Sequence, residues 1–209
     1  YTLSLILVVC SLGMKQAIAQ TVPATPKDDQ QLFSAANYQD MSWRHVGPFR
    51  GGRTNAVTGV RGNDLIYYMG TVGGGIWKTT DAGQSWFNIS DGYFSTASVG
   101  AITIAPSDQN VIYAGTGEHA VRGVMSTHGD GIYKSINAGQ SWMHIGLAGT
   151  RHIAGIAVHP TDPNTLLIAA QGAVFGPSDE RGIYRSTDGG DTWERTLYIN
   201  ETTGAADVV

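Results

Sequence analysis

The chain has 209 residues, and its 13 basic and 17 acidic side chains give a net charge of −4. This balance argues against a nucleic-acid-binding protein, whose surface would be strongly basic. Because the chain has 28 glycines and only 14% charged residues, its composition favours a turn-rich all-β structure over a helical or disordered one.

The N-terminal residues have the pattern of a targeting segment. An apolar run over residues 3–12 is followed by Ala17-Ile18-Ala19, which matches the small-residue pattern of a signal-peptide cleavage site. The run is too short to span a bilayer, so we predict a secretory signal peptide over residues 1–19 rather than a membrane anchor or a buried strand. It lacks a start methionine and a preceding basic segment, so we expect the sequence to be truncated at this end. Residues 20–42 are polar, contain Pro23 and Pro26, and are predicted to be a linker.

The cysteine count indicates the compartment. Cys10 is the only cysteine, and it lies within the predicted signal peptide, so the mature chain would contain none. An exported chain without disulfides favours a bacterial secreted, periplasmic or cell-envelope protein. After signal cleavage we expect no stable membrane span.

Short apolar and β-branched runs, separated by turn residues, follow in groups of four. The expected strands are 55–60, 65–70, 75–80 and 85–90; 99–105, 111–115, 131–136 and 141–145; and 153–158, 165–170, 182–187 and 192–199. These groups cover about 53–90, 98–146 and 152–199, and a fourth begins at 204. Four strands per repeat of this length are typical of a β-propeller blade. We therefore predict that residues 43–209 are the N-terminal part of an all-β propeller, whose remaining blades belong to the same full-length chain.

One phrase recurs in all three groups: Thr79–Trp86, Ser135–Trp142 and Ser186–Trp193, with the tryptophans 56 and 51 residues apart. Its hydroxyl and Asx side chains can bond nearby backbone groups and close a tight turn, and its glycine supplies a conformation that a Cβ would resist. The tryptophan then begins the next strand with a large apolar surface. The predicted structural residues of the turns are Asp81, Trp86, Asn137, Trp142, Asp188 and Trp193.

The loops of such a blade divide between two faces, because its strands alternate in direction. With the strands lettered A to D from the axis outward, the A–B turn and the repeated C–D turn share one face. The B–C loops and the D–A connections share the opposite face, which we call the loop face. Charged and histidine side chains gather on the loop face, either as ligand-binding residues or as inter-blade ion pairs. They are Arg50, Arg53, Glu118, His119, Arg122, Arg151 and His152.

The repeated turns, each preceded by Gly-Ile and an aromatic residue, resemble the Asp-box or BNR repeat of sialidases, sortilin-type receptors and related β-propellers. Asn137 departs from this pattern, since an Asp is usual there. The stretches 43–53, 115–118 and 151–153 add a resemblance to exported bacterial BNR propellers, which are grouped with the sortilin N-terminal domain and labelled glycosyl hydrolase. The resemblance implies a many-bladed propeller that acts on or binds carbohydrate, or a sortilin-like scaffold that binds peptides or proteins without catalysis.

Two enzyme families with this turn supply specific comparisons. Sialidases have a Phe/Tyr-Arg-Ile-Pro motif before the first Asp-box, but here Gly51-Gly52 follows Phe49-Arg50. Xyloglucan-cleaving propellers have a catalytic Asp before a Val-Gly-Gly turn, where this chain has Thr71. Glycoside hydrolysis needs two carboxyl groups, about 5 Å or about 6.5–9.5 Å apart.

Glu118 is the best single candidate for a catalytic carboxylate, and Asp130, Asp179 and Glu180 lie farther out in the loops. The histidines show no regular metal-ligand spacing. The turns also lack the acidic pattern of an EF-hand. We therefore predict no metal site and no cofactor.

Overall fold

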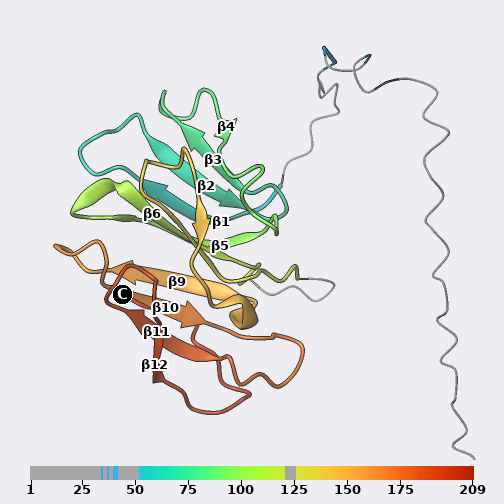
Figure 1. Cartoon of the computed structure of the whole chain (residues 1–209), viewed down its shortest axis with the longest axis vertical. Coiled ribbons are helices and arrows are strands. Elements are labelled where there is room, and N and C mark those ends of the chain that lie inside the picture. The colour runs from blue at the N-terminus through green and yellow to red at the C-terminus, as the bar shows by residue number, and fades with distance from the viewer. Residues whose placement is uncertain (1–33, 35–36, 38–39, 42–51, 121–125) are drawn as a thin grey trace, which may run out of the picture. The chain divides into compact units, whose positions relative to one another are not determined.

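The computed structural model describes residues 34, 37, 40, 41, 52–120 and 126–209 (Figure 1). The chain divides into two units, residues 1–49 and 50–209, and the second holds all the strands described below. In the first unit, the Asn37 backbone N–H donates to the Ser34 carbonyl at 2.9 Å. The predicted signal peptide lies outside the described residues, as does the predicted linker apart from the four positions named. No helix in the described part of the chain is long and apolar enough to cross a membrane.

The second unit contains three four-stranded antiparallel sheets, which confirms the predicted propeller blades. Blade one contains β1 (Thr54–Gly59), β2 (Tyr67–Thr71), β3 (Ile76–Thr79) and β4 (Phe87–Asn88). Blade two contains β5 (Val99–Ala105), β6 (Asp108–Thr116), β7 (Ile132–Ser135) and β8 (Met143–His144). Blade three contains β9 (Ile153–Val158), β10 (Leu166–Ala170), β11 (Gly182–Ser186) and β12 (Glu194–Leu197). A short 3₁₀ turn (η2, Ala148–Thr150) connects blades two and three.

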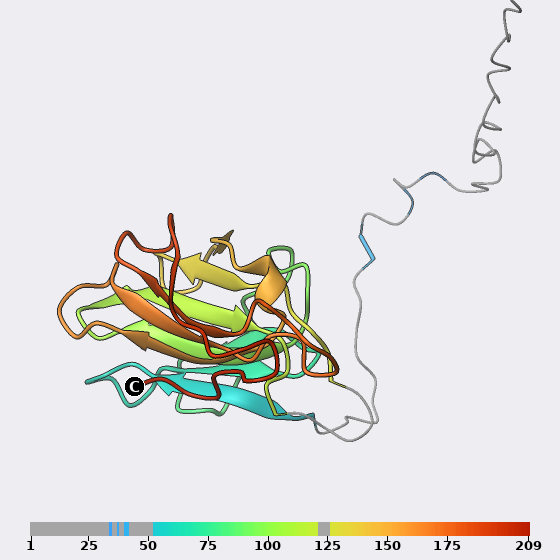
Figure 2. The same ribbon diagram turned by 90° about the horizontal axis from the view of Figure 1, so that it is seen from below.

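The sheets follow one another as stacked layers (Figures 1 and 2). The buried core consists of two apolar clusters, one between each pair of successive blades. Tyr68, Ile76 and Ile112 are buried in the cluster between blades one and two. Ile132 and Ile168 are buried in the cluster between blades two and three. Such a blade buries its surface only by stacking on its neighbours.

The repeated turns have the hydrogen bonds that their residue types predict. In blade one, the Thr79 hydroxyl accepts a bond from Gly83 N (2.9 Å) and donates to Asp81 Oδ1 (2.7 Å). The Asp81 carboxylate also accepts bonds from the backbone N–H of Ser85 (2.9 Å) and from its hydroxyl (2.5 Å). The same network occurs in blade three around Asp188. These side-chain bonds replace a backbone ladder at the hairpin end.

Blade two shows how the turn tolerates an amide. Asn137 Oδ1 accepts bonds from the Ser135 hydroxyl (3.0 Å) and from Ser141 N (2.9 Å), as the carboxylates do. Its Nδ2 then donates to the Ser141 hydroxyl at 2.8 Å, which reverses the direction of that one bond. The departure from the usual Asp therefore keeps the turn.

The tryptophans of these turns also join neighbouring blades. Trp142 Nε1 donates to the carbonyl of Ile89 in blade one (2.9 Å), and Trp193 Nε1 donates to the carbonyl of Ile145 in blade two (2.8 Å). Trp86 donates instead to Gly83 O within its own turn, at 3.1 Å. The Asp-box turns are therefore inter-blade connections as well as hairpin turns.

Residues 204–209, where the first strand of a fourth blade is expected, contain no assigned strand. They lie against blade three: Ala205 N donates to Ala170 O at 3.1 Å, and Gly155 approaches Asp207 and Val208.

Candidate ligand-binding site

The inner strands β1, β5 and β9 end on the loop face with the same local structure. In each blade, the residue that directly follows the second strand donates a backbone hydrogen bond to the residue that precedes the inner strand. The pairs are Val72 N to Arg53 O (3.0 Å), Gly117 N to Ser98 O (2.8 Å) and Gln171 N to His152 O (2.9 Å). Arg53, Ser98 and His152 therefore occupy equivalent positions in the three blades.

A β-bulge follows each of these positions. The register shifts between Thr54 and Ala56, between Val99 and Ala101, and opposite Ala169 and Ala170. A bulge leaves one residue unpaired and redirects the neighbouring side chains, and bulges are common beside functional sites. The loop-face ends of the inner strands are therefore irregular in all three blades.

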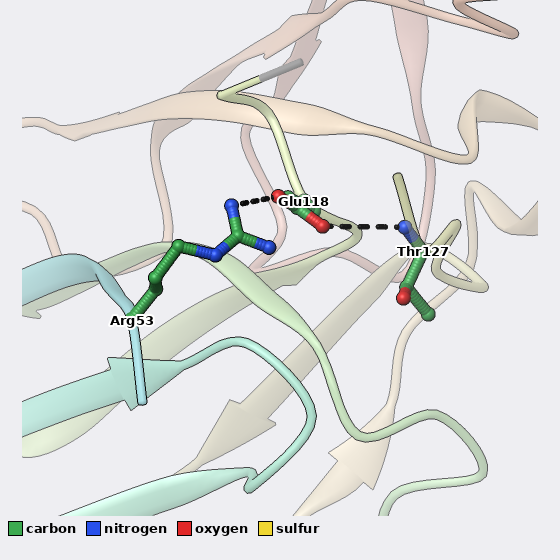
Figure 3. A network of polar contacts seen from close by, with 3 residues as sticks. All are labelled: Arg53, Glu118 and Thr127. Atoms are coloured by element: carbon green, nitrogen blue, oxygen red, sulfur yellow. Dashed lines mark hydrogen bonds and ion pairs between the residues drawn. The ribbon is translucent and has the colours of Figure 1, made fainter. Parts of the chain in front are cut away.

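Arg53 and Glu118 form an ion pair between blades one and two (Figure 3). The Glu118 side chain is 1% exposed, whereas that of Arg53 is 39% exposed. The backbone N–H of Thr127 donates to Glu118 Oε2 at 3.4 Å, and Glu118 N donates to Thr127 O at 2.8 Å. The carboxylate is thus fixed inside the protein and orients a guanidinium that remains partly accessible.

His152 is buried, and its Nδ1 lies 3.0 Å from the Gly172 carbonyl. Because a carbonyl only accepts, Nδ1 carries the hydrogen and Nε2 has a free lone pair. Burial lowers the pKa of His152; the bond to Gly172 opposes this shift, and nearby His128 and Arg151 add to it. The net direction is downward from 6.5, so the imidazole is neutral at pH 7.

Arg151 is exposed, next to His152, and has an unusual backbone conformation with φ of 58°. The Arg151 carbonyl accepts a 2.6 Å hydrogen bond from Gly129 N. It also lies so close to Gly117 that a Cβ added to this glycine would be 2.1 Å from the carbonyl oxygen. Non-glycine residues with positive φ concentrate at functional sites. Blade two thus holds the Arg151 backbone in place from two sides.

Buried polar atoms without a hydrogen-bond partner gather at the same end of the strands. In the described residues they are Asn55 Nδ2, Thr96 Oγ1, Ser98 Oγ, His119 Nδ1, His152 Nε2 and Gln171 Oε1. All six residues precede or begin an inner strand, or follow a second strand, so they lie on the loop face. Buried polar groups in native proteins are satisfied by protein, water or ligand. This end of the sheets is therefore a candidate site for polar ligands.

The structure brings together part of the predicted set. Arg53 and Glu118 are in contact, and Glu118 and Arg151 both influence His152 electrostatically. His119 follows Glu118 directly and has a buried Nδ1. Arg50 and Arg122 lie outside the described residues.

Sequence reasoning missed Asn55, Ser98 and Gln171. Aligning the three blades on the start of the inner strand would have found Ser98, because it stands where Arg53 and His152 stand.

Among the described residues, no group of three or more His, Cys, Asp or Glu side chains could hold a metal ion.

The other candidate carboxylates have structural partners. Burial alone would raise the pKa of Asp130, but bonds from Ser95, Tyr133 and Thr116 outweigh it and leave the pKa below its ordinary value. Glu180 accepts a bond from the Tyr184 hydroxyl at 3.2 Å. Asp179 is exposed, and its carbonyl accepts a bond from Arg195 Nη1.

Thr71, which replaces the Asp of xyloglucan-cleaving propellers, lies at the end of β2 and donates its hydroxyl to Gly75 O at 3.0 Å. A threonine hydroxyl is not a general acid or base at neutral pH. Position 71 therefore lacks the catalytic carboxylate that the resemblance to xyloglucan-cleaving propellers would imply.

Comparison with known proteins identifies the family to which this chain belongs. The family model Sortilin-Vps10, described as "Sortilin, neurotensin receptor 3", matches residues 63–203, well over half of the chain. The chain belongs to the Sortilin-Vps10 family. A xyloglucanase from Paenibacillus sp is 26% identical to this Sortilin-Vps10 chain over 194 residues, which cover 85% of the chain and 18% of the xyloglucanase.

Solved GH74 structures share the fold of this Sortilin-Vps10 chain. An ancestral GH74 enzyme has a TM-score of 0.61 at 22% identity, covering 79% of this chain and 21% of its own. The GH74 xyloglucanase from Xanthomonas campestris has a TM-score of 0.52 at 21% identity, covering 74% of this chain and 22% of its own. The chain thus spans about a fifth of the length of these relatives.

Proposed function

We propose that the protein containing this chain is exported and binds carbohydrate on its loop face, around the inner ends of β1, β5 and β9. The observation that carries the proposal is the cluster of buried, unpartnered donors and acceptors beside the partly exposed Arg53 guanidinium. A sugar presents several hydroxyls, each of which donates and accepts, so it matches such a mixed set. The xyloglucanase relative supports this ligand class.

The contacts of these residues suggest distinct roles in the proposed binding. In this proposal the partly exposed Arg53 donates to ligand oxygens while Glu118 fixes its guanidinium. The buried Nε2 of His152 is a hydrogen-bond acceptor behind them. Arg151 and His119 line the same end of the strands, and Arg50 and Arg122 stay predicted members of the site. Ligand specificity follows, because a site with buried polar groups rejects ligands that leave them unpaired.

Binding fits these residues better than cleavage. Glu118 is buried and ion-paired, and both Asp130 oxygens accept bonds from hydroxyl groups. A hydrolase needs an accessible acid and a second carboxylate at a defined distance. Catalysis by Glu118 stays a prediction, and the structure favours its role in positioning Arg53.

A second candidate function is binding of peptides or proteins without catalysis. The family match favours it, since the family model is described by a receptor, sortilin. The two functions differ in ligand class and can be separated by binding assays.

The test measures binding of neutral and acidic glycans, including xyloglucan, to the full natural protein by calorimetry, and measures glycan cleavage in parallel. We expect Arg53→Gln to weaken glycan binding about tenfold, since a hydrogen bond to a charged group is worth about 1.5–3 kcal/mol. Arg185→Gln is the control, because Arg185 is exposed on β11 near the Asp-box side.

Absence of binding to every glycan would reject the proposal, and binding of extended peptides would then support the second function. Equal weakening by Arg53→Gln and Arg185→Gln would remove the site from the loop face. Cleavage that Glu118→Gln abolishes without weakening binding would assign Glu118 a catalytic role.

A further inference from the structure

A second pocket lies on the loop face of blade one, and of the unpartnered groups described above only Thr96 lines it. Its volume is about 410 Å³. Ligand pockets typically measure about 300–1,000 Å³, so it can hold a sugar unit. It lies between the short glycine loop of residues 73–75 and the connection 90–97 that leads to blade two. Arg53, Glu118 and His152 do not line it.

Trp77 gives this pocket an aromatic wall in a fixed orientation. Its Nε1 donates to the Gly74 carbonyl at 2.8 Å, and the same carbonyl accepts a bond from Asn88 Nδ2 at 2.9 Å. These bonds tie the indole to the glycine loop and to β4. The ring is only partly buried, so part of its apolar surface faces the pocket.

The equivalent aromatic residues of the other blades are engaged within the protein. Tyr133 stacks on Phe94 with ring centroids 4.0 Å apart and donates to Asp130 Oδ2 at 2.7 Å. Tyr184 is buried and donates to Glu180 Oε2 at 3.2 Å. Blade one differs because its glycine loop has no side chains to cover Trp77. Its aromatic residue is therefore the one left to line a pocket.

The polar groups of the pocket indicate the charge of its ligand. Among the described residues that line it, Asp91 is the only charged one, and it is exposed. A carboxylate can accept two ligand hydroxyls but repels phosphates, sulfates and acidic sugars. The Thr96 hydroxyl, buried and unpartnered, lies in the same wall.

We infer that this pocket is a subsite for one neutral sugar unit, whose apolar C–H face lies on the Trp77 indole while its hydroxyls donate to Asp91. The inference rests on the proposed carbohydrate binding and extends it to a second, outer position on the same face. An oligosaccharide that binds at the inner strand ends would then gain affinity from blade one.

Two tryptophans of blade one provide a matched test. Trp77 and Trp86 are both partly buried, and each donates through Nε1 to the carbonyl three residues earlier, but Trp86 lies in the Asp-box turn on the opposite face. We would measure binding of xyloglucan oligosaccharides to the full natural protein and to Trp77→Leu, Trp86→Leu and Asp91→Ala. Circular dichroism would check that each variant folds.

We expect Trp77→Leu and Asp91→Ala each to weaken binding roughly three- to tenfold, and Trp86→Leu to leave it unchanged. Should Trp77→Leu fail to fold, the exposed Asp91→Ala decides alone. Normal affinity in Asp91→Ala and in folded Trp77→Leu, with Arg53→Gln still weakened, would overturn the subsite and leave the proposed function standing. If Trp77→Leu, Asp91→Ala and Arg53→Gln all bind every tested glycan with unchanged affinity, both the subsite and the proposed loop-face site are overturned.

Discussion

Trp142 offers the sharpest test of how the blades hold together. It is 5% exposed, it donates to Ile89 O in the preceding blade, and its ring meets Phe94 edge-on with centroids 5.4 Å apart. Trp142→Phe keeps an aromatic ring but removes the N–H and part of the buried surface. The lost surface costs roughly 1 kcal/mol. Leaving the Ile89 carbonyl without this donor costs about 1–2 kcal/mol more. We therefore expect the free energy of unfolding to fall by about 2–3 kcal/mol.

The same substitution at Trp86 is the control, because Trp86 is partly exposed and bonds only Gly83 within its own turn. We expect Trp86→Phe to cost less than about 1 kcal/mol. Urea unfolding, followed by far-ultraviolet circular dichroism, measures both losses. Equal losses would refute the reasoning, because they would show that the inter-blade hydrogen bond adds nothing to the turn itself.

Two further predictions concern the acid stability of a turn and the order of a loop. Hydrogen bonds from the Ser85 side chain and backbone, and from Thr79, lower the pKa of Asp81 from 3.8 to about 2. The contribution of the Asp81 carboxylate to stability is therefore complete above pH 3.8 and disappears as the pH falls through about 2. We expect Asp81→Asn to flatten the acid-unfolding curve in this range and to stay folded at pH 7, because the natural Asn137 keeps the same turn. An unchanged acid-unfolding curve would contradict this. Arg181 is 9% exposed and donates to the carbonyls of Gln171, Ala173, Gly176 and Glu201. We expect Arg181→Met to lower the free energy of unfolding by at least about 3 kcal/mol and to make residues 171–181 sensitive to limited proteolysis. A loop that resists the protease in this variant would exclude the role of Arg181 in ordering it.

The blade architecture was predictable because it depends on local chemistry that repeats. Each Ser/Thr-x-Asp/Asn-x-Gly phrase closes its own hairpin, so its position sets the neighbouring strands. β5 and β9 have the expected bounds. The outer strands β4 and β8 are only two residues long and β12 only four, shorter than expected, and each begins just after the tryptophan of its turn, which therefore belongs to the turn and not to the strand.

The candidate site was predictable only in part, because it depends on contacts between blades. The loop-face rule placed Arg53 and Glu118 on one face, but their ion pair joins residues 65 positions apart. Ser98 carries no charge and attracts no attention in the sequence, yet it is equivalent to Arg53 and His152. The free Nε2 of His152 depends on the carbonyl of Gly172, which no sequence pattern reveals.

The tryptophan bonds between blades have a consequence for how such proteins evolve. Their acceptors, Ile89 O and Ile145 O, are backbone carbonyls, and so are the acceptors of Lys78 and Lys134 at Ala138 and Gly189. A backbone acceptor is present whatever side chain the position carries. Gene duplication can therefore add a blade, and mutation can then change its side chains, without any compensating substitution in the neighbour that supplies the acceptor.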